Sequence, residues 1–269
     1  MSGGYCYYSV ENTKGHCALA PGGEVKQPPK IKQDDSLLSV ELCTMKPSLV
    51  TLSCGQSPRT DILPLLLEHL PEEQIVHVGL LDDLTHAQIE RQYAPDTGSK
   101  MQVIRLNDGS QVCVSAEKIT TELQQRILML EECGYDTILL LCSGDCGPLY
   151  ASTAVLLEPD RLVPPLVKAI VGGHQVGIVV SVAGQIHAQK NKWKNLKHPP
   201  CFAVASPYHA NDEPLIEAAL SLQEQGADVV VLDCMGYHPR HRDFLQALLG
   251  IPVLLSNMLI ARLAAELLV

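Results

Sequence analysis

Two stretches of the sequence decide the fold of this chain, Thr137-Ile-Leu-Leu-Leu-Cys-Ser-Gly-Asp-Cys-Gly147 and Val229-Val-Val-Leu-Asp-Cys-Met-Gly-Tyr237. Each begins with an unbroken apolar run and then passes into a loop that contains cysteine and glycine. A strand that is apolar throughout is typical of a parallel sheet whose two faces are both covered. Parallel strands must be joined by crossovers, which are usually helices. The two stretches therefore predict an α/β fold.

The same alternation of apolar runs and helical patterns continues on both sides of these stretches. The expected strands are Leu49–Ser53, Ile75–Val78, Thr137–Leu141, Gln175–Ser181, Phe202–Ala205, Val229–Leu232 and Pro252–Leu255. The expected helices are Asp61–Leu70, Ala116–Cys133, Pro159–Val171, Pro214–Gln225, Arg240–Leu249 and Met258–Leu268. Met101–Ser115 is an exception, because its two short runs flank an Asp-Gly turn and predict a β-hairpin. We expect mainly parallel sheets flanked by helices, in two lobes.

Composition and charge exclude several classes of function. The chain has 269 residues, of which 46% are hydrophobic, which is enough to form a core. Its formal net charge of −10 argues against a nucleic-acid partner, because such binding needs a basic surface. The longest apolar stretch, Ile251–Val269, is interrupted by proline and by charged residues, so we expect no membrane span. Ten cysteines indicate a reducing compartment, and we expect a cytoplasmic protein.

Residues 1–45 differ from the rest of the chain. They contain a Pro28-Pro29 pair and a Lys/Gln-rich patch, and they show no sustained periodicity. Such composition predicts a flexible N-terminal extension that is dispensable for chemistry.

Cysteines recur in the loops that follow the expected strands. Ligands of open parallel sheets bind beyond the carboxyl ends of the strands. Cys54 and Cys142 directly follow such ends, and Cys234 comes one residue after another. The residues beside the last two thiols are counted as candidate substrate contacts: Ser143, Gly144, Met235 and Gly236.

Cys142 and Cys234 can be interpreted as a proton-transfer pair. Each is expected close to the amino end of a following helix, whose dipole lowers the pKa of a thiol. One thiolate could then take a proton from carbon while the other thiol delivers a proton to the opposite face, with no metal or organic cofactor. The alternative is that both side chains only pack, as buried free cysteines often do.

Other cysteine chemistries fit the sequence less well. Cys142-x3-Cys146 lacks the C-x2-C spacing of a zinc knuckle, and no second clustered pair is present, so we expect no metal. His238 and His241 could contribute ligands, but histidines at a helix start are usually solvated. A hydrolase built on Cys234 and His238 would need a G-x-C-x-G-like elbow, which is missing.

The loop Cys54-Gly-Gln-Ser-Pro-Arg-Thr-Asp61 is a candidate anion site. Ser57 is expected to cap a helix with Pro58 at its first position. Backbone N–H groups there, with Arg59, would suit a carboxylate or phosphate. The alternative is simple capping, with Arg59 facing solvent. Tyr208, in a similar strand-to-loop turn, could line the same cavity, while Asp233 either orients its loop or accepts loop N–H bonds.

Four motifs resemble those of the AroM protein family. They are Cys54-Gly-Gln-Ser-Pro-Arg-Thr-Asp-Ile62, Leu157-Glu-Pro159, Gly226-Ala-Asp-Val-Val-Val-Leu-Asp-Cys-Met-Gly-Tyr237 and Pro252-Val-Leu-Leu-Ser-Asn-Met-Leu-Ile-Ala-Arg262. The resemblance runs from about Lys46 to Val269. The AroM family is similar to the aspartate/glutamate racemase superfamily, which includes hydantoin racemases, maleate isomerases and arylmalonate decarboxylases. It implies two pseudo-symmetric α/β lobes, with a cysteine from each lobe flanking the substrate.

This resemblance implies roles for particular parts of the chain. Cys142 falls on the first-lobe thiol and Cys234 on the second-lobe thiol. The loop residues Gln56, Ser57 and Arg59 fall where the superfamily holds the substrate's carboxylate. The expected first lobe is 46–150, joined by a C-terminal helix at 256–269, and the expected second lobe is 151–255.

Two cysteines depart from the family pattern. Cys54 stands where the family more often has an aliphatic residue, and Cys146 adds a thiol beside Cys142. Cys146 and Cys142 could form a disulfide, or the extra thiols could change which sulfur acts in the first lobe.

The resulting functional hypothesis is a cofactor-independent racemase or epimerase that acts on a small carboxylate or an amino-acid derivative. One alternative is a single-cysteine cis–trans isomerase or decarboxylase, and another is a non-catalytic metabolite-binding protein. The expected partner is a small-molecule carboxylate, and the resemblance is compatible with a homodimer.

Overall fold

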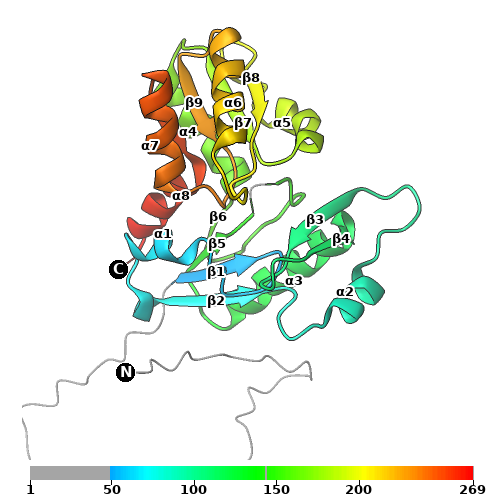
Figure 1. Cartoon of the computed structure of the whole chain (residues 1–269). Coiled ribbons are helices and arrows are strands. Elements are labelled where there is room, and N and C mark those ends of the chain that lie inside the picture. The colour runs from blue at the N-terminus through cyan, green and yellow to red at the C-terminus, as the bar shows by residue number, and fades with distance from the viewer. Residues whose placement is uncertain (1–48, 143, 269) are drawn as a thin grey trace, which may run out of the picture. The chain divides into compact units, whose positions relative to one another are not determined.

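The computed structural model describes residues 49–142 and 144–268 (Figure 1). The expected extension, residues 1–45, and the candidate contact Ser143 therefore lie outside the described residues. The described part belongs to one compact unit, Cys43–Val269.

Two four-stranded parallel sheets form the framework of this unit. The first has the order β2-β1-β5-β6, with β1 Leu49–Ser53, β2 Ile75–Gly79, β5 Thr137–Leu140 and β6 Val155–Leu157. The second has the order β10-β9-β7-β8, with β7 Val176–Val180, β8 Cys201–Val204, β9 Val229–Leu232 and β10 Val253–Leu255. Within each sheet the chain order is second, first, third, fourth, read from β2 in the first sheet and from β8 in the second. This repeated order confirms the predicted pair of pseudo-symmetric lobes.

Helices cover both faces of the first sheet because successive strand side chains point to opposite sides. Val50 and Leu52 of β1 pack in a core that includes α3, Ala116–Glu132. Leu49 packs on the other face with α1, Leu63–Leu67, and α8, Ser256–Ala265. The chain's last described helix thus packs on the first sheet.

The second sheet is covered in the same manner. One face packs against α6, Glu213–Glu224, and α7, Pro239–Leu249. The opposite face packs against α4, Pro159–Val171, and against Trp193, which follows α5, Ile186–Lys192. Short 3-10 turns occupy Glu72–Gln74 and Ala183–Gln185.

The predicted β-hairpin is present as β3, Met101–Arg105, and β4, Gln111–Ser115, which pair antiparallel. Gly109 in its turn has a φ of +86°, a conformation that glycine adopts without strain. The helix α2, His86–Tyr93, packs on β4.

Three elements were not predicted: α2, α5 and β6. They are short, and β6 has only three residues. A capping box formed by Thr85 and Gln88 begins α2 and was the available sequence signal. Because β6 pairs with β5, the first sheet continues beyond residue 150, where the boundary between lobes was expected.

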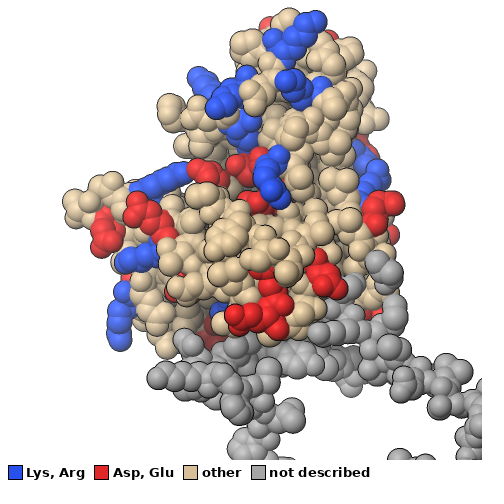
Figure 2. Space-filling view, turned by 180° about the vertical axis from the view of Figure 1, so that it is seen from behind, with Lys and Arg blue, Asp and Glu red and all other residues tan. Residues whose placement is uncertain are grey.

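On the face of the described part in Figure 2, basic side chains stand in separate groups among uncharged and acidic ones. Within residues 49–142 and 144–268, no helix has the length and apolar character needed to cross a membrane.

The strand order also determines where a ligand would bind. In such sheets the strand order reverses between the first and third strands, and ligands bind at this switch point, beyond the carboxyl ends. In the first lobe these strands are β1 and β5, which precede Cys54 and Cys142. In the second lobe they are β7 and β9, and β9 precedes Cys234. The two predicted thiols therefore occupy equivalent places, after the third strand of each sheet.

Candidate functional site

Three cysteines meet at the carboxyl edge of the first sheet. Leu52 of β1 pairs with Leu140 of β5, so Cys54 and Cys142 each lie two positions beyond a paired residue. Cys146 returns from the following loop, and its Sγ lies 3.8 Å from the Sγ of Cys54. All three Sγ atoms lie within 4.8 Å of one another, a grouping that can hold a metal ion. All three thiols are free, so the Cys142–Cys146 disulfide left open by the sequence is not formed.

This cluster lowers the pKa of Cys142. Contacts with the thiols of Cys146 and Cys54 hold the pKa of Cys142 well below its usual value, despite burial. Contacts with the thiols of Cys142 and Cys54 raise the pKa of Cys146, and burial raises it further. The contact with Cys142 and burial also raise the pKa of Cys54. Cys142 is thus the thiol of the three whose pKa is lowered. The lowered pKa of Cys142 agrees with the prediction from the sequence. The predicted cause, a helix terminus beside this thiol, is wrong, because β5 is followed by a loop and β6 rather than by a helix.

Cys234 has the opposite tendency. Burial raises its pKa, which contacts with the Gly236 backbone and the Ser181 side chain offset only in part. The prediction of a lowered pKa is therefore wrong for Cys234. The physical reason is burial, and the next helix along the chain, α7, begins only at Pro239.

His238 and His241 form the start of α7 rather than a solvated pair. The His238 side chain accepts a hydrogen bond from the N–H of Arg240, and the His241 ring accepts one from the N–H of His238 at 2.9 Å. His241 is only 3% exposed, and its ring packs edge-on against Tyr237. The expectation that both histidines are solvated is thus wrong for His241, because the capping bond draws its ring inward.

Arg59 is the charged residue that acts on both predicted catalytic thiols. Its positive charge favours the thiolate form of both, although burial outweighs this effect at Cys234 and the pKa of that thiol is raised. Asp61 holds it by two bonds, from Nε at 2.8 Å and from Nη2 at 2.7 Å. Tyr208, in the loop after β8, donates from its Oη to Asp61 at 2.9 Å. This chain of contacts joins the loop after β1 to the second lobe.

Gln56 and Ser57 are engaged within the protein. The N–H and the hydroxyl of Ser57 both donate to the Asp82 carboxylate at 2.7 Å. Gln56 accepts at Oε1 from the N–H of Asn107, in the hairpin turn. Ser57 is not a helix cap and Pro58 is not in the first turn, because α1 begins at Leu63 after a cis Ser57-Pro58 peptide. The carboxylate of Asp82 occupies the serine hydroxyl that the predicted cap would have used.

The remaining candidate contacts lie in the two thiol loops. The Gly144 carbonyl lies 3.8 Å from the Sγ of Cys142. Met235 is buried in the core of the first lobe. A Cβ on Gly236 would lie 2.6 Å from Cζ of Tyr208, so this glycine permits close packing against the tyrosine ring.

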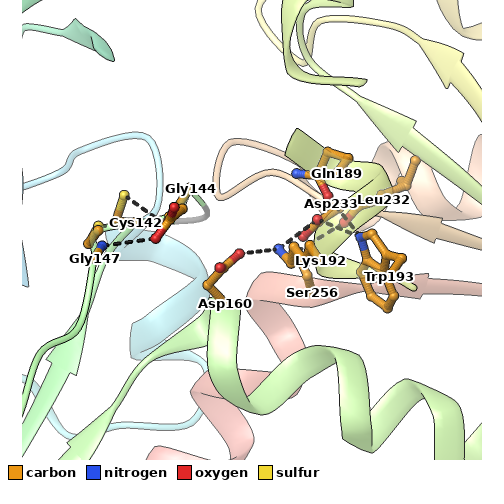
Figure 3. Close-up of polar contacts among 12 residues, drawn as sticks. Cys142, Gly144, Gly147, Asp160, Gln189, Lys192, Trp193, Leu232, Asp233 and Ser256 are labelled. Carbon is orange, nitrogen blue, oxygen red and sulfur yellow. Dashed lines mark hydrogen bonds and ion pairs between the residues drawn. The ribbon is translucent and has the colours of Figure 1, made fainter. Parts of the chain in front are cut away.

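A buried ion-pair network supports the Cys234 loop and was missed by the sequence analysis (Figure 3). The Nζ of Lys192 lies 2.7 Å from Asp233 and 3.2 Å from Asp160. Trp193 donates from Nε1 to Asp233 at 3.3 Å. Burial alone would lower the pKa of Lys192, but Asp233 and Asp160 outweigh it and the pKa is raised. Asp233 therefore accepts from side chains of the α5 segment, which positions the start of its loop.

A cavity of about 220 Å³ reaches the first-lobe thiols. Polar or sulfur-bearing side chains in its lining are Cys142, Asp145, Cys146, Glu158, Asp160 and Arg161. Arg59, Tyr208 and Cys234 do not line it. The cavity thus gives access to Cys142 and Cys146 from the side of the acidic residues.

The family model described as AroM protein matches residues 49–268. The chain belongs to the AroM family. This membership confirms the family that the four sequence motifs predicted. No curated protein matches this AroM sequence.

Solved structures share the fold of this AroM protein at low sequence identity. The maleate isomerase Iso from Pseudomonas putida S16 is 12% identical, with a TM-score of 0.50 over 80% of this chain and 90% of that chain. Glutamate racemase from Aquifex pyrophilus is 14% identical, with a TM-score of 0.49 over 82% and 84%. Allantoin racemase from Klebsiella pneumoniae is 13% identical, with a TM-score of 0.48 over 81% and 85%. The similarity to the maleate isomerase concerns the two-lobed α/β fold alone.

Proposed function

We propose that this AroM protein is a cofactor-independent racemase or epimerase that acts on a small carboxylate or an amino-acid derivative. The observation that carries the proposal is the placement of Cys142 and Cys234. They follow the third strands of two sheets with the same strand order, and the charge of Arg59 acts on both. A substrate between the two thiols would present one face of its stereocentre to each.

The proposed reaction is a transfer of one proton on and one proton off carbon. The Cys142 thiolate takes the α-proton, and the bonding electron pair stays on the substrate as an enolate-like carbanion. The Cys234 thiol then gives its proton to the opposite face, which leaves Cys142 protonated and Cys234 as a thiolate. The reverse reaction uses the same steps with the roles exchanged. The opposite pKa shifts of the two thiols support this division into base and acid.

Arg59 is the proposed anchor of the substrate carboxylate. Its positive charge would also stabilise the carbanion as charge develops. Gln56 and Ser57 contribute by holding the Arg59 loop, since their side chains bond to Asn107 and Asp82. Ser143, Gly144, Tyr208, Met235 and Gly236 remain predicted contacts around the thiols. The proposal also includes a cytoplasmic location and no nucleic-acid or membrane partner, and it is compatible with a homodimer.

Exchange with solvent deuterium tests this proposal. The reduced protein is incubated in D2O with chiral amino acids, hydantoins, hydroxy acids and aryl-substituted acids. We expect deuterium at the α-carbon of a substrate, and its loss in Cys142→Ala and in Cys234→Ala. Cys113→Ala is the matched control, because that thiol is exposed on the hairpin. Exchange that survives in the Cys142→Ala/Cys234→Ala double variant would overturn the proposal.

Two other outcomes would point to the alternatives. Turnover that needs one thiol but not the other would indicate single-cysteine isomerisation or decarboxylation. Tight binding of a ligand without deuterium incorporation would indicate a metabolite-binding protein.

A further inference from the structure

We propose that Cys54, Cys142 and Cys146 bind a thiophilic metal ion, Zn²⁺, at the carboxyl edge of the first sheet. The three sulfur atoms, here called the cysteine cluster, lie within 4.8 Å of one another. The proposal depends on this geometry and not on the proposed racemase function. It also departs from the sequence expectation of no metal, which rested on spacing along the chain alone.

The distances within the cysteine cluster suit zinc. A Zn–S bond of about 2.3 Å places two sulfurs of a tetrahedral site about 3.8 Å apart. Cys54 and Cys146 already have their Sγ atoms 3.8 Å apart. The other sulfur pairs lie within 4.8 Å, so bringing them to the same separation requires only a small change in side-chain torsion.

The backbone around the cysteine cluster is well positioned for a ligand set. Cys54 and Cys142 extend from paired neighbouring strands. The Thr120 hydroxyl, on α3, donates to the Cys146 carbonyl at 2.8 Å and holds the third ligand's backbone. Gln102 on β3 places its Nε2 3.7 Å from the Sγ of Cys142, where a donor stabilises a metal-bound thiolate.

The charge of nearby side chains also favours a complex of Zn²⁺ with thiolates. Three thiolates and one Zn²⁺ have a net charge of about −1, and the guanidinium of Arg59 acts on Cys54 and Cys142 with the opposite sign. The cavity beside Cys142 and Cys146 is lined by three carboxylates, each of which is paired with a lysine or an arginine, so the thiolates are the ligands that the site offers to a metal. The cavity also has room for a water molecule as a fourth ligand.

Zinc in the cysteine cluster would occupy the sulfur that the proposed reaction uses as a base. A metal-bound thiolate has its lone pair engaged and cannot take a proton from carbon. Zn²⁺ is therefore expected to inhibit any activity that depends on Cys142.

Metal titration of the full chain tests the proposal. The reduced, metal-free protein is titrated with Cd²⁺, which gives a thiolate-to-metal charge-transfer band in the ultraviolet. We expect the band to saturate at about one ion per chain, and we expect Zn²⁺ that is added first to delay the band until Cd²⁺ displaces it. Cys54→Ala and Cys146→Ala are expected to lose the band, while the control Cys113→Ala keeps it. A band that survives in Cys54→Ala and Cys146→Ala would overturn the proposal.

Cys234→Ala separates this proposal from the racemase function. That variant is expected to be inactive in deuterium exchange but to bind Cd²⁺ like the unmodified protein. A protein that exchanges deuterium but shows no charge-transfer band would overturn the metal site alone.

Protection from alkylation gives a second test that needs no variant. Cys142 is partly accessible and Cys113 is exposed. Zn²⁺ is expected to slow the reaction of maleimide with Cys142, mapped by peptide mass, and to leave the rate at Cys113 unchanged. Equal rates at Cys142 with and without Zn²⁺ would overturn the proposal, as would a Cys54–Cys146 disulfide that resists reductant.

Discussion

Replacing Lys192 by methionine should destabilise this protein more than any exposed ion pair can explain. The Lys192 side chain is 5% exposed and the Asp233 side chain 1%, with 2.7 Å between Nζ and Oδ2. Lys192→Met leaves the Asp233 carboxylate buried without its cation. Breaking a buried pair in this way typically lowers the free energy of unfolding by about 3–5 kcal/mol. The Asp160 carboxylate is 32% exposed, so water can solvate it and it adds little to this loss.

The double variant Lys192→Met/Asp233→Asn identifies the cause. The asparagine side chain carries no charge and keeps an oxygen for the Trp193 N–H, so the unpaired carboxylate is gone. We expect the double variant to be more stable than Lys192→Met alone by about 2 kcal/mol. Such recovery cannot come from lost packing of the lysine chain, which both variants share.

Urea unfolding of the full chain at neutral pH measures these differences. The matched control is Lys100→Met, because Lys100 and Asp145 form an ion pair of similar length whose side chains are 61% and 58% exposed. That control should lose at most about 1 kcal/mol. The reasoning is refuted if Lys192→Met is no worse than Lys100→Met, or if Asp233→Asn adds to the loss caused by Lys192→Met.

Two further predictions concern the second lobe. Burial lowers the pKa of His241 to about 4 from an ordinary 6.5, so between these pH values the unfolded chain binds a proton that the native protein does not. Stability should therefore fall as pH drops through this window, by at most about 3 kcal/mol more than in His241→Gln, which keeps the capping acceptor but does not titrate. Parallel curves of unfolding free energy against pH would contradict this. Gly236→Ala should lower the unfolding free energy by about 1–3 kcal/mol, because its Cβ would meet the Tyr208 ring and Pro207. The added variant Tyr208→Ala should recover part of that loss, and an unchanged urea midpoint in Gly236→Ala would rule out the clash.

Local patterns in the sequence predicted most of the fold. The apolar runs at Thr137–Leu140 and Val229–Leu232 became central strands, and the Asp-Gly turn became the hairpin of β3 and β4. The elements that escaped prediction, α2, α5 and β6, are short and bury few residues, so they carry little periodicity. Missing α5 also meant missing Lys192, whose role depends on a turn of helix brought against Asp233.

The candidate site could be predicted from the sequence only in part. The sequence by itself placed Cys142 and Cys234 at strand ends and assigned the chain to its family, because apolar runs and motifs are local properties of the chain. Only the tertiary structure brought Cys54 against Cys142 and Cys146, since that contact depends on β1 pairing with β5 in a particular register. The tertiary structure also decided the pKa values of these thiols. A thiol's pKa depends on burial and on charges within a few ångströms, and those distances exist only after the two strands have paired.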